Sequence, residues 1–379
     1  MITNKGVYFM GSAKDVEISI EPTEVAMGEA TFTFKDTYSV DDLVAAYDIQ
    51  MANEIPGKGN ALGRMINYNF QVLVPDVVTH YRKGYSSVLT KPGDLSKFVI
   101  EVLAAMVYKD HIRLGGEPIP GPKMTVDFVY DIPSKATNFI IPLEVITRNE
   151  LGPDSSIMKM YKKGEITPQD IGLESIPEDG KLEQPVITYT TKHEQGDKFL
   201  TRKQAMVLSG LTPEQFKQME ALEMVVHNAI DAHTAKVAQR YEIDLVHPDG
   251  KREWIWNKNY PMLGDCFGTF DEDRFEILLE EDNDVLKLSK QVLRDWMRST
   301  PWYQEKFLPW KQIVDKLGKE KKSEWPAIEP APQIPENLMQ YVSKIYDVGS
   351  RMWTLEASEE EVHGLIEQFH ELRRLGVIR

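Results

Sequence analysis

The most informative segment of this chain is Asp249-Gly-Lys-Arg-Glu-Trp-Ile-Trp256, followed by the turn sequence Asn257-Lys-Asn259 and by Tyr260-Pro-Met-Leu263. In an alternating strand over residues 251–256, Asp249, Lys251 and Glu253 share one face. Trp254 and Trp256 share the opposite face with Arg252, and we expect both tryptophans to pack in the core. The turn predicts that residues 260–263 return as the paired strand. A hairpin centred near Lys258 would place Asp265 opposite Lys251 and diagonal to Glu253, roughly 7 Å away.

Two carboxylates and an ammonium group on one face suggest a definite chemistry. Hard oxygen donors are the ligands that Mg²⁺ prefers, and the hydrated ion carries nucleotide phosphates. The pattern therefore favours a site for Mg²⁺ and phosphate. A polar hairpin face held by salt bridges is the alternative, and it is the more common explanation for such a pattern taken alone.

Composition bounds the classes of protein that this chain can be. Its 379 residues can bury a substantial core, and 42% hydrophobic with 27% charged residues is usual for a globular protein. A formal charge of −15, from 59 acidic and 44 basic residues, argues against general nucleic-acid or anionic-membrane binding. No apolar run reaches the roughly 18 residues that span a bilayer, and the N-terminus lacks the apolar core of a secretory signal. Because Cys266 is the one cysteine, an intrachain disulfide is excluded and we expect a cytoplasmic location.

Local patterns predict the order of elements along the chain. Short β-prone runs punctuated by Gly, Pro and charge predict strands at 7–10, 16–20, 30–34, 123–130 and 138–147. Thr212-Pro-Glu-Gln215 is a helix-capping sequence, and apolar residues at helical spacing predict one long helix through Tyr241. Further helices are predicted at 60–73, at 284–298 and, as a pair with a charged break at 356–361, within 336–379. Two regions read as surface segments, the loop system at 152–183 with a short helix and the proline-rich connector at 320–335.

Histidines on the long predicted helix carry no metal signal by themselves. His227 and His233 lie six residues apart, and that spacing does not give the same-face pair that metals favour. We therefore interpret both as packing or helix-surface residues.

Several segments, in order along roughly 340 residues, resemble the SAICAR synthetase family of purine-biosynthesis ligases. Those that carry the resemblance are Gly11-Ser-Ala-Lys-Asp-Val16, Lys35-Asp-Thr-Tyr-Ser-Val-Asp-Asp42, Ile55-Pro-Gly-Lys-Gly59, Pro142-Leu-Glu-Val-Ile-Thr-Arg-Asn149, Gln184-Pro-Val-Ile-Thr-Tyr-Thr-Thr-Lys192, Asp249-Gly-Lys-Arg-Glu253, Leu263-Gly-Asp265, Asp271-Glu-Asp-Arg274, Lys290-Gln-Val-Leu-Arg-Asp-Trp296 and Pro335-Glu-Asn-Leu-Met-Gln-Tyr341. The chain is identified as a divergent and longer member.

The resemblance implies a two-lobed α+β fold. A smaller N-terminal lobe with an antiparallel sheet would cover ATP over residues 1–120. A larger, ATP-grasp-like catalytic lobe with flanking helices would span 121–319, and a connector with C-terminal helices at 320–379 would pack on it.

The reaction implied is the joining of L-aspartate to 5-aminoimidazole-4-carboxylate ribonucleotide, with ATP and Mg²⁺, to give SAICAR, ADP and phosphate. The partners are therefore small-molecule substrates, with no nucleic acid and no membrane. A homo-oligomer is compatible with the sequence, which does not fix the oligomeric state.

Site residues follow from the same resemblance, together with the chemistry that each step needs. The expected catalytic residues are Lys251, Glu253 and Asp265, with Glu253 and Asp265 as the metal ligands. The expected ATP contacts are Gly11, Ser12, Ala13, Lys14, Glu144 and Lys251. The expected substrate contacts are Asp36, Ser39, Asp42, Lys58, Arg148, Ser155, Ser156, Asp271 and Arg274. Lys58 can also be read as a turn lysine, and either arginine as part of a structural salt bridge.

The chain departs from the family pattern at three places. Ser12 stands where the family usually has Lys, Cys266 stands where it has Glu, and Thr269-Phe270 replaces a Pro before Asp271. These differences leave two alternatives open. One is a divergent ligase for another amine or nucleotide-like carboxylate, and the other is a catalytically inactive nucleotide-binding protein.

Overall fold

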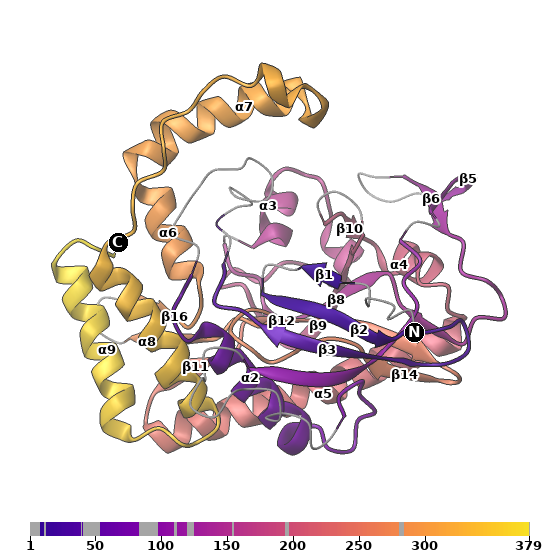
Figure 1. The fold of residues 1–379 in the computed structure, drawn as a ribbon, viewed down its shortest axis with the longest axis horizontal. Coiled ribbons are helices and arrows are strands. Elements are labelled where there is room, and N and C mark those ends of the chain that lie inside the picture. Colours follow the sequence, from indigo (N-terminus) through magenta and orange to yellow (C-terminus); the bar gives the residue numbers. More distant parts are fainter. Residues whose placement is uncertain are drawn as a thin grey trace, which may run out of the picture.

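The structure is a computed structural model that describes residues 8–10, 13–38, 40, 54–82, 98–109, 112–119, 125–153, 155–193, 197–279 and 284–378. Within these residues the strands form five sheets, and every pair of neighbouring strands is antiparallel. Helices pack against the sheets, so the α+β class expected from the sequence is confirmed (Figure 1). None of the helices in the described part of the chain combines the length and the apolarity that crossing a bilayer requires.

The N-terminal sheet has the strand order β1-β2-β3-β4, formed by Tyr8–Met10, Lys14–Ile20, Gly28–Phe34 and Val99–Ala104. Alternate residues of β3 are buried, as expected for a strand with one face on the core. Helix α2 (Lys58–Tyr68) and the π-helical turn Asn69–Leu73 follow, as the sequence pattern predicted. Gly59, in the first turn of α2, lies so close to the backbone of Phe34 that a Cβ there would be 2.7 Å from the Phe34 carbonyl oxygen.

The central sheet has the order β10-β9-β8-β12, formed by Phe199–Leu200, Lys181–Thr191, Leu143–Glu150 and Asp249–Arg252. Helix α5 (Pro213–Tyr241) is the long helix predicted from its capping sequence, and its Thr212 cap accepts the Gln215 N–H. It covers one face of this sheet, where Thr147 donates a 2.6 Å hydrogen bond to Glu223. Because side chains alternate along β8, Glu144 and Arg148 point to the opposite face of the sheet.

The hairpin after the central sheet is confirmed, but its predicted register is wrong. Strands β13 (Trp254–Asn257) and β14 (Tyr260–Leu263) pair Asn257 with Tyr260, so the turn centres between Lys258 and Asn259. Lys258 adopts the left-handed conformation that such a two-residue turn requires. The strand also breaks at Glu253, because β12 pairs with β8 while β13 pairs with β14 and with β7 (Asn138–Ile140). The carbonyl of Glu253 accepts the N–H of Gly264, so Glu253, and not Lys251, lies across the hairpin from the segment that carries Asp265.

The remaining strands form two smaller sheets, and one of them contains a strand in a segment that was predicted to be helical. Strands β11 (Asp244–Val246), β15 (Glu276–Leu279) and β16 (Asp284–Lys287) make one sheet, and β5 (Ile112–Ile119) pairs with β6 (Val126–Tyr130) in the other. Residues 284–287 were predicted as helix but form β16, since pairing with β15 buries Leu286 and Leu288 two residues apart. The helix α6 begins only at Gln291 and runs to Ser299.

Helices and turns fill the connections between these sheets. The loop system predicted at 152–183 contains α3 (Ser156–Lys162) and a 3₁₀ turn (Pro168–Ile171) before β9 begins, and α4 (Arg202–Leu208) precedes α5. After α6 the chain continues through a π-helical turn (Trp302–Phe307), α7 (Leu308–Leu317) and a 3₁₀ turn (Lys319–Glu324). In Figure 1, α7 extends away from the rest of the molecule.

The C-terminal segment forms the two predicted helices, α8 (Glu336–Trp353) and α9 (Glu359–Arg374), which lie side by side in Figure 1. Helix α8 packs against the N-terminal α2 as well as the later elements. The Trp353 indole donates to Asn69 at 2.7 Å, and Arg64 donates to Ser350 at 2.6 Å. The lobe boundaries near 120 and 319 remain a prediction.

A buried histidine makes the stability of the fold depend on pH. The His80 ring lies between Phe32 and Phe70 with centroid distances of 5.5 and 5.7 Å, and burial lowers its pKa to about 4 against the opposing charge of Asp265. Between pH 6.5 and 4, His80 is therefore protonated in the unfolded chain but remains neutral in the folded chain. The free energy of unfolding should fall by up to about 3 kcal/mol from this residue as the pH drops through that window.

This prediction is tested by measuring the free energy of unfolding in urea at several pH values for the wild-type chain and for two histidine variants. His80→Phe should flatten the pH dependence below 6.5, whereas His363→Phe, at an exposed position of α9, should leave it unchanged. An unaltered pH slope in His80→Phe would contradict it.

Candidate active site

One face of the central sheet carries a row of polar side chains. On this face β8 presents Glu144 and Arg148, and β12 presents Asp249 and Lys251. Strand β9 and the residue after it add Thr188, Thr190 and Lys192. The alternation is visible in the contacts: Thr190 donates to Glu144 at 3.2 Å and Arg148 donates to Thr188 at 3.1 Å. Because side chains alternate across a strand, the residues between them point to α5 instead.

Lys251 lies at the centre of this polar face. Its ammonium group is 3.0 Å from a Glu144 oxygen and 3.2 Å from a Glu272 oxygen. Although burial disfavours the charge, Glu272, Glu253 and Glu144 raise the pKa of Lys251 well above its ordinary value. Lys251 is thus a fixed cation held among three acids.

Glu253 and Asp265 form a pair of neighbouring acids, each contacted by its own lysine. Lys192 forms an ion pair with Glu253, and Lys14, from β2, forms one with Asp265. Burial and the Asp265 charge raise the pKa of Glu253. Burial would also raise the pKa of Asp265, but Lys14 and Lys192 hold it below its usual value. Two close carboxylates with opposite pKa shifts, flanked by two ammonium groups, can exchange their lysines for a divalent cation.

A second charged group lies at the other end of the polar face. Asp249 accepts a 2.6 Å hydrogen bond from Arg148 and lies 3.3 Å from the Arg274 guanidinium. Arg148 is buried, whereas the Arg274 side chain is 53% exposed. One carboxylate therefore holds two arginines, and the exposed guanidinium still has donors to offer to an anion.

Lys58 and Asp271, both expected to contact substrate, contact each other. Their ion pair is 2.8 Å long and its two side chains are almost fully buried. Lys290 lies 3.2 Å from the same carboxylate, and Tyr346 of α8 donates to it at 2.7 Å. Burial would raise the pKa of Asp271, but Lys290 and Lys58 hold it below its usual range. This cluster links α2, the start of α6 and α8 through one carboxylate.

The remaining predicted residues are placed by local backbone structure. Asp36 accepts hydrogen bonds from the N–H groups of Gly57 and Gly59, at 3.1 and 2.8 Å, and so fixes the turn before α2. Ser155 is the buried N-cap of α3, and Ser156 is exposed in its first turn. Ala13 precedes β2, and its carbonyl accepts the N–H of Lys35. Gly11, Ser12, Ser39 and Asp42 lie outside the described residues.

Two residues that contact the predicted site residues were not predicted from the sequence. Lys192 and Glu272 belong to segments that carry the family resemblance, yet neither was assigned a role. Lys192 lies two residues beyond Thr190 and four beyond Thr188, and this alternation was the available signal. No comparable periodicity marks Glu272, whose contact with Lys251 depends on the loop after Asp265 folding back over β12.

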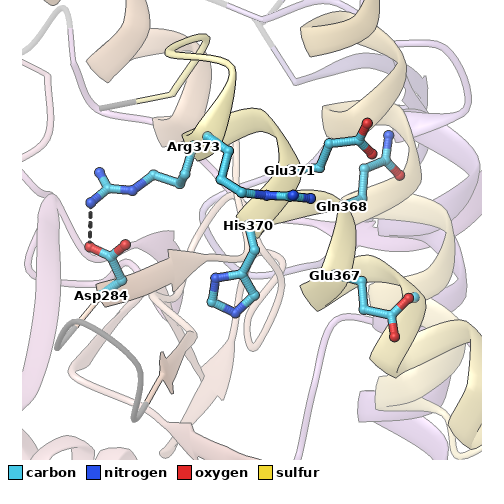
Figure 2. A pocket seen from close by; sticks show the side chains of 8 residues that line it. Asp284, Glu367, Gln368, His370, Glu371 and Arg373 are labelled. Atoms are coloured by element: carbon cyan, nitrogen blue, oxygen red, sulfur yellow. Dashed lines mark hydrogen bonds and ion pairs between the residues drawn. The ribbon is translucent and has the colours of Figure 1, made fainter.

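A cavity of about 690 Å³ lies away from this face, between β16 and α9. Figure 2 shows its lining side chains, among them Glu367, His370 and Glu371, with Arg373 bonded to Asp284. Its charged rim does not include any residue of the polar face.

A model of the family described as SAICAR synthetase matches residues 31–309, nearly three-quarters of the chain. A protein of Archaeoglobus fulgidus assigned as a phosphoribosylaminoimidazole-succinocarboxamide synthase is 30% identical over 341 residues, covering 89% of this chain and 91% of that protein. The phosphoribosylaminoimidazole-succinocarboxamide synthase of Thermoplasma volcanium is 34% identical over 231 residues, covering 59% of this chain and 71% of the relative.

Solved structures share the fold. A SAICAR synthase structure has a TM-score of 0.59 at 17% identity, and covers 94% of this chain and 98% of that chain. The Saccharomyces cerevisiae SAICAR synthase, solved in complex with SAICAR, has a TM-score of 0.55 at 18% identity with the same coverage. The chain belongs to the SAICAR synthetase family, a family of ligases in purine biosynthesis. The C-terminal helices lie beyond the family model, which ends at residue 309.

Proposed function

We propose that this chain joins L-aspartate to the carboxylate of 5-aminoimidazole-4-carboxylate ribonucleotide, with ATP as the source of energy. The γ-phosphoryl group of ATP is transferred to the ribonucleotide carboxylate, which leaves ADP and an acyl phosphate. The aspartate amine then attacks the acyl carbon, loses a proton and displaces inorganic phosphate, so that SAICAR, ADP and phosphate result. Membership of the family supports this reaction, and the acid pair Glu253 and Asp265 between Lys14, Lys192 and Lys251 is the observation that carries the assignment of the site.

The residues on the polar face suit a Mg²⁺ ion, because Glu253 and Asp265 offer hard oxygen donors at adjacent positions. When bound there, Mg²⁺ would neutralise charge on the phosphates of ATP. Lys14 and Lys192, released from the two acids, would contact phosphate oxygens, for which a flexible point charge is well suited. Lys251 stays held by Glu144 and Glu272 and orients the transferring group from a fixed position.

The arginine pair marks the proposed position of the ribonucleotide phosphate. Arg148 and Arg274 share Asp249, which orients both guanidinium groups and leaves Arg274 open to solvent. A planar guanidinium matches two phosphate oxygens at once. The ribonucleotide would thus lie across the sheet, with its phosphate near β12 and its carboxylate toward Lys251.

The proposed function is tested by following ADP release from ATP with the two other substrates added singly and together. Release that requires both the imidazole carboxylate ribonucleotide and L-aspartate supports the proposal. Release with the ribonucleotide and only a different amine would identify a divergent ligase instead. Binding of ATP without release under any of these conditions would identify a nucleotide-binding protein that lacks turnover.

Arg274→Met should raise the KM for the ribonucleotide about 10-fold or more, since one charge-assisted hydrogen bond to phosphate is lost. The KM for ATP should stay within about twofold, because Arg274 lies at the opposite end of the polar face. Steady-state kinetics with each substrate varied in turn measures both values.

Arg240→Met is the matched control, because Arg240 is also a half-exposed arginine paired with an acid, Glu359. Equal changes in the two KM values of Arg274→Met, or the same change in Arg240→Met, would remove Arg274 from the phosphate site.

A further inference from the structure

A second group of ligand-type side chains lies on the other side of the central sheet, against α5. His227 and Asp231 are one turn apart on that helix, and His247 lies on the connection between β11 and β12. One donor atom from each of the three lies within 4.8 Å of the others. The pairing of His227 with His233 considered from the sequence is therefore not the relevant one, because the partner histidine comes from another element.

The donor atoms of this cluster face one another closely. Nδ1 of His247 is 2.6 Å from one Asp231 oxygen, and Nε2 of His227 is 3.3 Å from the other. The side-chain oxygen of Asn149 lies 2.9 Å from the same His227 nitrogen. Two imidazole nitrogens and a carboxylate can surround one cation after small shifts, because tetrahedral metal–ligand bonds near 2.1 Å put neighbouring ligand atoms about 3.4 Å apart.

The far side of His247 is arranged as it is in established metal sites. Its Nε2 lies 2.9 Å from Asp273, which is fully buried and also held by Arg252 at 2.6 Å. A ligating histidine usually donates its other ring N–H to a carboxylate, which fixes the ring and leaves its second lone pair for the metal. Asp273 is in that position, and it presents Nδ1 of His247 to the cluster.

The cluster can be reached from a neighbouring cavity. The His227 side chain is fully buried, and the ring nitrogen that it offers to a cation is Nε2, the one that faces Asp231 and Asn149. A cavity of about 330 Å³ opens beside the cluster, lined among others by Asn149, Asp231 and His247. The Asp231 side chain is 33% exposed, so a cation and a water ligand can reach the cluster from this cavity.

We propose that His227, Asp231 and His247 form a site for a divalent transition-metal ion of the Zn²⁺ class, with the fourth position open to the cavity. Imidazole nitrogen with one carboxylate is a donor set that suits Zn²⁺, and it differs from the all-oxygen pair Glu253 and Asp265 on the opposite face. The site joins α5 to the segment that leads into Asp249. Metal binding therefore positions the carboxylate that holds Arg148 and Arg274.

The rival arrangement is a hydrogen-bonded network with a proton in place of the metal. Burial disfavours a charged His247, but Asp231 and Asp273 raise the pKa of this histidine, and its imidazolium form would satisfy both acids. The two arrangements differ in metal retention, which is measured without substrate and independently of turnover.

The experiment uses the full chain, stripped by dialysis against a chelator and then titrated with Co²⁺ in the absence of nucleotide. We expect one equivalent of Co²⁺ to bind with the visible absorption of a four- or five-coordinate N/O site, and Zn²⁺ to displace it. Asp231→Asn and His227→Asn should each weaken the affinity about 100-fold or more. His233→Gln is the matched control, because His233 is a buried histidine of the same helix whose ring is hydrogen-bonded to the Trp353 carbonyl. The His233→Gln variant should bind the metal with wild-type affinity.

Absence of a bound equivalent in the wild-type chain would overturn the proposal in favour of the proton-filled network. Wild-type affinity in both Asp231→Asn and His227→Asn would also overturn it, since the ion would then bind elsewhere. Thermal unfolding of each stripped variant checks that it is folded. Asp231→Asn decides the question if His227→Asn does not fold, because Asp231 lies at the edge of the cavity.

Discussion

Replacing Asp265 with asparagine is expected to lower kcat on the order of 100-fold or more and to raise the Mg²⁺ concentration needed for half-maximal rate. Asparagine keeps the shape of the side chain but lacks the charge that is proposed to hold the cation. The substitution also leaves Lys14 without its acid partner. The positive charges of Lys14 and Lys192 are then balanced by one carboxylate of the acid pair instead of two. Initial rates measured across a range of Mg²⁺ concentrations at saturating substrates report both effects, and Glu253→Gln should behave in the same way.

Asp295→Asn is the matched control for these variants. Asp295 is a half-exposed acid of α6 whose ion-pair partners, Lys287 at 2.7 Å and Arg298 at 3.7 Å, are not residues of the proposed site, so the same change of functional group should leave kcat and Mg²⁺ dependence unaltered. Wild-type kinetics in both Asp265→Asn and Glu253→Gln would reject the proposed metal ligands, even if the chain catalyses the proposed reaction.

Arg252→Met is expected to lower the free energy of unfolding by about 3–5 kcal/mol. Arg252 is fully buried, 2.6 Å from Asp273 and 3.5 Å from Glu223, and both of those side chains are also fully buried. Removing the cation leaves two carboxylates in the core with less compensation. Glu223 keeps its hydrogen bonds from Thr147 and Trp254, which limits the loss. Urea unfolding at neutral pH gives the difference.

The control for Arg252→Met is again Arg240→Met, at a pair whose side chains are 50% and 61% exposed. An exposed ion pair contributes only about 0–1 kcal/mol, so the two arginine variants should differ by several kcal/mol. Similar losses in both would show that the Arg252 cluster does not carry the stability inferred from its burial.

Local chemistry was sufficient to predict the elements whose signals lie within a few residues. The Thr212 cap and the apolar spacing after it specify α5, because capping and helical periodicity act within the helix itself. The turn after Asn257 specifies the hairpin for the same reason, and Trp254 and Trp256 are buried as their alternation predicted. Residues 284–287 show where this fails, because the strand β16 exists only through its pairing with β15.

The family, the α+β class and the residue types of the proposed site could be predicted from the sequence, since these depend on motifs in fixed order along the chain. Which charged side chains meet became known from the folded structure. Lys14 reaches Asp265 across 251 positions, Lys192 reaches Glu253, and His247 joins His227 on α5. A one-residue difference in the hairpin centre and the break at Glu253 changed the neighbour of Asp265 from Lys251 to Glu253. Strand register and sheet exchange are set by the packing of distant elements, which no local pattern of residues encodes.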